Sequence, residues 1–451
     1  MSNQQLLEPI IEGGIHSTHY FNGRRLTAED MDREKKANRQ HERLLGQAIG
    51  EGVVYGLEVG LPSGQAAEGT TLEIQKGLAI NRNGDTLYLP QKISLSLVPP
   101  PEEVQFSKAK FEDCSKDGPI EIPRNTGVYA VLIRPAIDLS GRAPMSSIPD
   151  DGSIVGCGRG ELVEGVQFKV VKMDLNGPAF DELDESTKTK LMEVSAKSDD
   201  KSVSIFKNIV AHACFGTEEI RKFIEDPFGG NDFSSYGAMD KLRSLAEDSK
   251  YKITDNDVPL AILRWTQKKI QFVDMWAVRR RPYEPTPPAT WPTLIGPRRL
   301  AVAEAIFFQF QEQIIQMTTL NAIQSQLASI EVSDYFVYLP ALGLIPITGI
   351  GSSTGFDYLK FFNNLTIRNP VHLEGQKIDS LIHNSLIYSP IALNSKELIW
   401  LYIVRENMEL VSKNTINRPQ PYIIFANANI PYQGNARFNI NRWDFSNYAK
   451  I

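Results

Sequence analysis

The stretch LTAEDMDREKKANRQHERLLGQAIGEGVVYGLEV, from Leu26 to Val59, contains both patterns from which the fold is built. Its first part predicts a helix from about Ala28 to about Ile49, roughly 30 Å long at 1.5 Å per residue. Thr27 and Asp30 suit the start of this helix, because the hydroxyl can accept an unpaired backbone N–H and an acid favours the positive end of the helix dipole. The second part has glycine-punctuated apolar residues, which predict a strand.

The predicted helix has few apolar residues, and they are distributed unevenly. Its last two turns carry enough of them to dock on a core, and we expect them to do so: Leu44, Leu45, Ala48 and Ile49. The earlier turns are basic and acidic, and they must face water or another protein chain. Both interpretations stay open, and the second makes four basic residues candidates for a partner interface: Arg33, Lys35, Lys36 and Arg39.

Short apolar runs separated by glycine and asparagine turns follow the helix, which is typical of a β-rich domain. Asn83-Gly84 favours a hairpin turn, since both residues accept a positive φ. From about residue 180 to about residue 250 the pattern becomes helical, and strand patterns resume near Val258. We therefore predict a helical insertion into a β-rich N-terminal domain over residues 1–283.

Five prolines between Tyr283 and Pro297 predict an extended linker over residues 284–297. Beyond it, residues 298–451 are predicted to form a helix and a β-rich C-terminal domain, so the fold class is α+β. Six apolar residues of this helix are spaced 3, 4, 3, 4 and 3 apart, as in a coiled coil. The helix is either a core helix of its own chain or part of an oligomer interface, with Phe307, Phe310 and Ile314 as candidate contacts. The six are Leu300, Ala303, Phe307, Phe310, Ile314 and Met317.

The composition excludes several classes of protein. With 451 residues, 42% of them hydrophobic and 23% charged, the chain is typical of a globular protein. A net charge of -6 argues against nucleic acid as a partner, because phosphate binding needs clustered positive charge. No apolar run reaches the length of a transmembrane helix, and no secretory signal is visible, so we expect a cytoplasmic protein.

A search for catalytic, metal and cofactor sites is negative. His16 and His19 are three residues apart, but no acidic partner or HExxH motif accompanies them. No phosphate-binding loop, dinucleotide fingerprint or nucleophile elbow is present. Cys157 has Arg159 close by in sequence but lacks a base. We therefore predict no cofactor and no enzyme, and favour an interaction or structural protein.

The segment from His19 to Val59 resembles one that recurs in proteins from gene clusters of phage-tail-like contractile injection systems. That pattern has a [YF]F-x-G-x-x-L-T-A-x-D start, a charged helix and a G-x-V-x-G-L-x-V strand. Tyr55 departs from the pattern, because a cysteine is expected there in many relatives. The matching residues are Tyr20, Phe21, Gly23, Leu26, Thr27, Ala28, Asp30, Gly52, Val54, Gly56, Leu57 and Val59.

The resemblance implies a non-catalytic structural subunit in or around the baseplate of a contractile particle. Its partners would be baseplate, sheath or tube proteins and further copies of itself, and the particle would assemble in the cytoplasm and be released or anchored to a membrane. A cap or fibre-attachment component of the same particle is an alternative. A second alternative is a carbohydrate- or surface-binding module, which would use aromatic residues such as Trp400, Tyr402 and Trp443.

Overall fold

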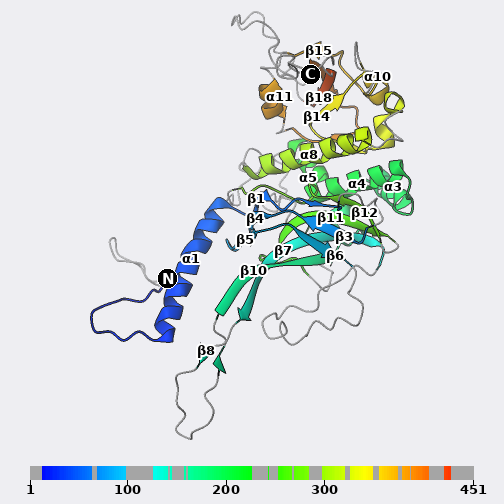
Figure 1. The fold of residues 1–451 in the computed structure, drawn as a ribbon. Coiled ribbons are helices and arrows are strands. Elements are labelled where there is room, and N and C mark those ends of the chain that lie inside the picture. The colour runs from blue at the N-terminus through cyan, green and yellow to red at the C-terminus, as the bar shows by residue number, and fades with distance from the viewer. Residues whose placement is uncertain are drawn as a thin grey trace, which may run out of the picture.

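The computed structural model has a mixed α+β fold, as predicted. A C-terminal β domain, a layer of helices and a central sheet are stacked along an elongated molecule, and helix α1 (Ala28–Ile49) projects from the side (Figure 1). The bounds of α1 and its capping box of Thr27 and Asp30 agree with the prediction. The structure describes residues 13–62, 69–97, 125–140, 143–144, 157–158, 161–225, 242, 252–266, 269–283, 297–319, 326–348, 355–373, 378–385, 388–405 and 421–427.

The central sheet is antiparallel, with strand order β10-β7-β11-β12. Helices α2 to α5 lie between β10 and β11 in the sequence, although these strands complete one sheet. These four helices cover residues 178–225, within the range where the sequence predicts a helical insertion. The strands are β7 (Gly127–Ser140), β10 (Glu161–Lys172), β11 (Val258–Thr266) and β12 (Lys269–Asp274), with a further pair β8 (Ala143–Pro144) and β9 (Cys157–Gly158) beyond them.

The central sheet is buried on both faces along β11 and along residues 128–133 of β7. Along β7, Ala130 and Leu132 join the core beneath the helices, while Val131 and Ile133 join the core beneath two smaller sheets. This alternation follows from the two-residue repeat of a strand, and burial of both faces fixes the register of β7. The smaller sheets contain β1 (Gly52–Gly56), β4 (Gly77–Ile80) and β5 (Thr86–Leu89), and β2 (Val59–Gly60), β3 (Thr71–Ile74) and β6 (Ile93–Ser96).

Helix α8 (Pro297–Thr319) is a core helix and joins the two parts of the molecule. Ile306 packs in the core of the central sheet, while Phe310 and Ile314 are 1% and 3% exposed in the core of the C-terminal domain. The predicted partner interface at Phe310 and Ile314 is therefore wrong, because their side chains are already covered by this chain. Phe307 is half-buried and packs against the C-terminal sheet.

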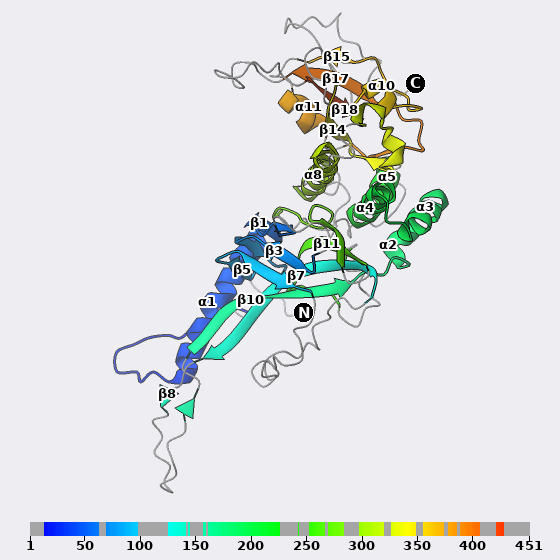
Figure 2. The same cartoon turned by 45° about the vertical axis from the view of Figure 1, so that its right-hand side comes forward.

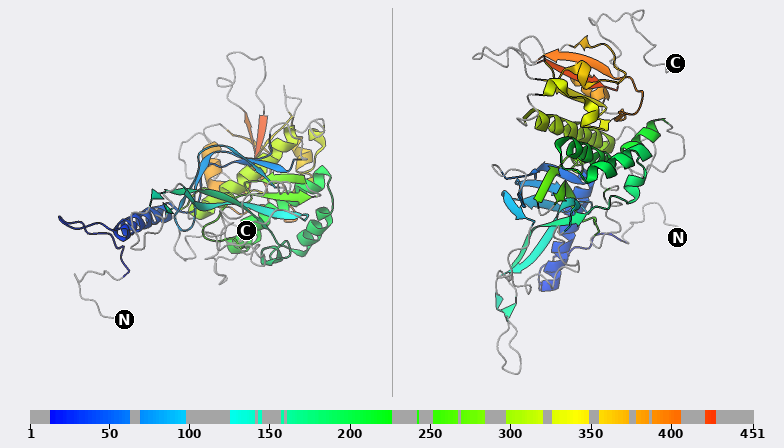
Figure 3. Two further views of the ribbon diagram at one scale, coloured as in Figure 1. Left: turned by 60° about the horizontal axis from the view of Figure 1, so that its bottom comes forward. Right: turned by 90° about the vertical axis from the view of Figure 1, so that its right-hand side faces the viewer.

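The helical layer separates the central sheet from the C-terminal domain, as the right-hand view of Figure 3 shows. The C-terminal sheet has order β14-β18-β17-β15, with a separate pair of β13 and β16. The predicted linker lies outside the described residues except for Pro297, and so does the tail after Asn427. The helices of the layer are α2 (Pro178–Asp181), α3 (Glu185–Ser195), α4 (Asp200–Phe215) and α5 (Thr217–Glu225). The C-terminal elements are η3 (Leu327–Ser329), η4 (Val332–Asp334), β13 (Tyr338–Leu339), β14 (Leu342–Pro346), α10 (Tyr358–Phe361), β15 (Val371–His372), α11 (Ile378–Ser385), β16 (Ile391–Ala392), β17 (Trp400–Arg405) and β18 (Pro421–Ala426).

Asn208 of α4 connects the helical layer to the C-terminal domain. Its side-chain oxygen accepts hydrogen bonds from the backbone N–H groups of Val337 (2.8 Å) and Tyr338 (2.9 Å). Its side-chain nitrogen donates to the carbonyl oxygen of Tyr338 at 3.1 Å. Asn208 is 1% exposed, so water cannot replace these bonds if the side chain is removed.

His212 of α4 makes stability depend on pH. Its ring stacks on Tyr338, its Nδ1 lies 2.8 Å from the Thr217 hydroxyl, and burial lowers its pKa to about 3. Below pH 6.5 the unfolded chain binds a proton at this residue that the folded chain does not. We therefore expect the free energy of unfolding to fall as the pH is lowered from 6.5 to 3. The contribution of His212 to this fall is up to about 5 kcal/mol.

The measurement is urea unfolding across this pH range for wild type and His212→Asn. The variant is expected to lose stability at neutral pH, because it loses the ring stacking, but to depend less steeply on pH between 6.5 and 3. An unchanged slope would contradict the assignment of this pH dependence to His212.

Candidate interaction surface

An arm projects from the body of the molecule, and most residues of its helix are exposed. It consists of α1, the segment 13–27 before it, and the outer part of the hairpin of β7 and β10, residues 134–140 and 161–167. Figures 1 and 2 show α1 and this hairpin extending away from the sheet in a similar direction. An ion pair between Arg39 and Glu164 joins them at 3.1 Å.

The segment 13–27 is tied to the free end of α1 by polar contacts. The Thr18 hydroxyl donates to the carbonyl oxygen of Asp30 at 2.8 Å, and the Thr18 N–H donates to the carboxylate of Glu34 at 3.1 Å. Arg24 pairs with Asp30 at 2.5 Å. The hydrogen bond from the backbone of Thr27 is the main reason that the pKa of Asp30 lies below its ordinary value, with Arg24 adding to it. The free end of the arm is therefore an ordered structure.

The base of α1 packs against the neighbouring backbone through its glycines. The prediction that its apolar residues pack on a core is therefore wrong. A Cβ at Gly46 would lie 2.1 Å from the carbonyl oxygen of Gly84, and one at Gly50 would lie 1.7 Å from that of Tyr283. Arg43 adds two hydrogen bonds to the Asp85 carboxylate, at 2.7 and 3.2 Å. Backbones approach so closely here that only a residue without a side chain fits.

Because glycine occupies the docking side, the apolar side chains of α1 point outward. Leu45 is 67% exposed, Ile49 56% and Met31 52%, and Leu44 is exposed as well. The expected packing is wrong for a geometric reason: the strands approach the helix from the side that carries Gly46 and Gly50. The last two turns of α1 thus present apolar surface to the surroundings.

The four basic residues that were predicted as a partner interface all belong to the arm. Arg33 and Lys36 form pairs within the helix, with Asp30 at 3.8 Å and Asp32 at 3.5 Å. Arg39 forms the ion pair with Glu164 of the hairpin. Lys35 is exposed and has no ion-pair partner among the described residues. The basic side chains of these pairs are at least one-third exposed, and ion pairs at a surface contribute about 1 kcal/mol or less, so they do not prevent contact with another protein.

Exposed aromatic residues lie at both ends of the arm and were not predicted from the sequence. Tyr20 and Phe21 are exposed at its free end. At its base, Tyr55 of β1 and Tyr88 of β5 flank Leu78 of β4 in one cross-strand row on the outer face of their sheet. Single exposed apolar residues are normal on a protein surface, but several of them grouped along the arm and next to its base are typical of an interaction site.

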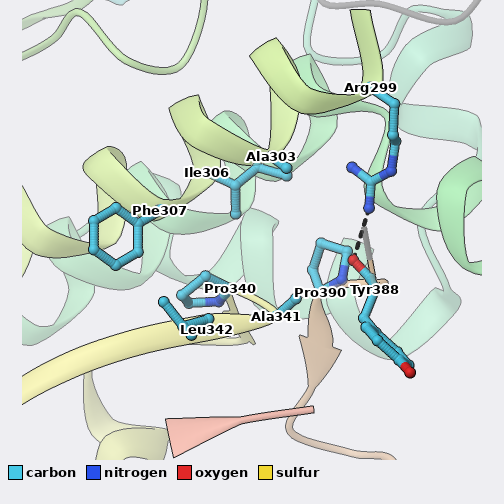
Figure 4. A pocket seen from close by; sticks show the side chains of 9 residues that line it. All are labelled: Arg299, Ala303, Ile306, Phe307, Pro340, Ala341, Leu342, Tyr388 and Pro390. Carbon is cyan, nitrogen blue, oxygen red and sulfur yellow. Dashed lines mark hydrogen bonds between the residues drawn. The ribbon is translucent and has the colours of Figure 1, made fainter. Parts of the chain in front are cut away.

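The pocket and the potential metal ligands elsewhere in the described residues are unsuited to catalysis or metal binding. The pocket in Figure 4 has a volume of about 10 Å³, about what one water molecule needs. Its one charged side chain, Arg299, donates to the carbonyl oxygen of Tyr388 at 2.7 Å. Within the described ranges, no three His, Cys, Asp or Glu residues are grouped so that they could hold a metal ion. His16 and His19 are therefore not part of such a group there. The side chain of Cys157 lies outside the described residues.

None of the helices in the described part of the chain combines the length and hydropathy that crossing a bilayer requires. Comparison with known proteins finds no family model and no curated protein that matches this chain. The arm and the sequence motif that it contains are therefore the features of this chain that bear on its function.

Proposed function

We propose that this chain is a non-catalytic structural subunit of a phage-tail-like contractile injection system, located in or around the baseplate and acting through protein–protein contacts. The projecting arm is the observation that carries the proposal. Residues 20–59, where the sequence resembles proteins of such systems, form the free end of the arm, its helix and the first strand at its base. The resemblance and the exposed surface thus fall on the same structure.

The surface of the arm suits contact with other subunits. It combines exposed apolar side chains with many charged groups, the mixture found in protein–protein interfaces that have an apolar centre and a polar rim. The carbohydrate-binding alternative has no comparable support, because Tyr402 is fully buried and Trp400 is half-buried in the C-terminal sheet. The other aromatic residues of that hypothesis, Trp443, Phe445 and Tyr448, lie outside the described residues.

The test is to tag the chain and, separately, to delete its gene in the organism that encodes it. Sheath-containing particles are then isolated and studied by mass spectrometry and electron microscopy. We expect the tagged chain in the particles, and a defined gap at the baseplate end when it is missing. Complete particles that form without the chain and never contain it would overturn the proposal, and a gap elsewhere would overturn the baseplate location.

Reversing charge on the arm is expected to weaken assembly without unfolding the chain. In Arg33→Glu/Lys36→Glu both replaced side chains are exposed, and the buried Asp30 keeps its pair with Arg24, so the free energy of unfolding is expected to change by about 1 kcal/mol or less. Incorporation into particles is expected to fall severalfold, measured by quantitative mass spectrometry. The control, Lys201→Glu/Lys222→Glu, reverses two charges away from the arm. Equal incorporation of both variants would show that this side of α1 is not a contact surface.

A further inference from the structure

Six residues of α1 form one continuous exposed stripe, which we call the outer stripe. They are spaced 4, 3, 4, 3 and 4 apart, the repeat that keeps residues on one side of a helix that packs against another helix. At 100° per residue, the stripe lies about a quarter turn from Arg39, Arg43 and Gly46, which face the hairpin and the base. The residues are Met31, Lys35, Asn38, Glu42, Leu45 and Ile49, all of them exposed.

The charges of the outer stripe define how a second copy of the helix can pack on it. If two copies ran parallel, Lys35 would face Lys35 and Glu42 would face Glu42, which is destabilising. The six positions are symmetric about Gln40, so an antiparallel copy places Leu45 opposite Lys35 and brings Glu42 within one turn of it. Lys35 and Glu42 have no ion-pair partners among the described residues. Antiparallel pairing gives each charge a partner of opposite sign.

The apolar residues fit the same arrangement. Met31 of one helix lies opposite Ile49 of the other, at both ends of the stripe. The free end of one arm, with Tyr20 and Phe21, is brought to the base of the other arm, near Tyr55. A twofold contact needs a surface that is complementary to itself. In the antiparallel arrangement the apolar residues at the free end of each arm face those at the base of the other.

We propose that two copies of this chain associate through antiparallel α1 helices along the outer stripe. The inference does not depend on the proposed function, because a dimer of the isolated chain forms or fails to form whether or not the chain belongs to a particle. The partner of the outer stripe is thus a second copy of this chain. It is held by two Lys35–Glu42 pairs and by apolar contacts at both ends of the stripe.

Sedimentation equilibrium of the full chain tests the charge pairing. We expect a monomer–dimer equilibrium in which Lys35→Glu or Glu42→Lys alone raises the dissociation constant about tenfold or more, since two attractive pairs become repulsive. The double variant Lys35→Glu/Glu42→Lys restores the pairs and is expected to bind nearly as tightly as wild type. Lys36→Glu, on another side of α1, is the control and leaves the constant unchanged. A wild-type chain that stays monomeric, or a double variant that is not rescued, overturns the proposal.

Cysteine cross-linking tests the direction of the helices, in a background with Cys114→Ser and Cys157→Ser. The antiparallel arrangement predicts a disulfide between Met31→Cys in one copy and Ile49→Cys in the other when the two variants are mixed. Each variant alone is expected to form little disulfide with itself, because like positions lie at opposite ends of the pair. Efficient self-cross-linking of Met31→Cys would indicate parallel helices and overturn the proposal.

Discussion

Replacing Asn208 by alanine is expected to lower the free energy of unfolding by about 3 kcal/mol or more. The variant loses three hydrogen bonds, and it leaves the buried backbone groups of Tyr338 and the half-buried N–H of Val337 without these partners, each buried group at a cost of about 1 to 3 kcal/mol. Urea unfolding followed by far-ultraviolet circular dichroism measures the loss. Because these bonds connect α4 to the C-terminal domain, faster proteolysis between the helical layer and that domain is expected as well.

The control for Asn208→Ala is Asn369→Ala, which removes an exposed asparagine outside the arm. Surface substitutions of this kind usually change stability by about 0.5 kcal/mol or less, so this variant is expected to be about as stable as wild type. If Asn208→Ala lost no more stability than the control, the connection between the two domains would have to reside elsewhere, for example in the apolar side chains of α8.

Replacing Gly46 by alanine is expected to destabilise the protein by about 2 kcal/mol, although the same change usually stabilises a helix by about 1 kcal/mol. The sign is reversed because the new Cβ would lie 2.1 Å from the carbonyl oxygen of Gly84, a backbone atom that moves only if the hairpin turn moves. Hydrogen exchange of the α1 amides is expected to become faster, since the helix loses its attachment to the base.

Gly165→Ala is the matched control, because a Cβ at Gly165 would meet nothing within 4 Å. We expect little change in stability there. A Gly46→Ala variant that is more stable than wild type would show that α1 is not held by close contact between backbones. The pairing of Arg43 with Asp85 would then be its main attachment.

The bounds of α1 could be predicted because a capping residue and a turn-forming glycine act locally. The helical insertion could be predicted because a change of residue periodicity is visible without knowledge of partners. The direction that α1 faces could not be predicted from these signals. Leu44, Leu45 and Ile49 indicate a buried side by composition, yet only the position of the β4–β5 turn decides which side of the helix is covered.

The residues predicted as a partner interface lie in different environments, and the contacts expected of the basic ones stay a prediction. Arg33, Lys35, Lys36 and Arg39 belong to the exposed arm, whereas Phe310 and Ile314 are buried within the chain. The regular spacing in α8 was consistent with either a core or an interface, because both bury one side of a helix. The spacing of the outer stripe is equally present in the sequence, but only half of its residues are apolar, so its composition alone does not indicate a contact surface.

By itself, the sequence determined the local structure of this protein: the helix from Ala28 to Ile49, the helical insertion and the alternation of the strands. These features depend on caps, turns and residue period, which involve neighbours along the chain. Only the tertiary structure decided which surfaces are left open. Exposure depends on residues distant in sequence, as when Gly84 and Tyr283 cover the glycine side of α1 and leave Leu45 to the outside.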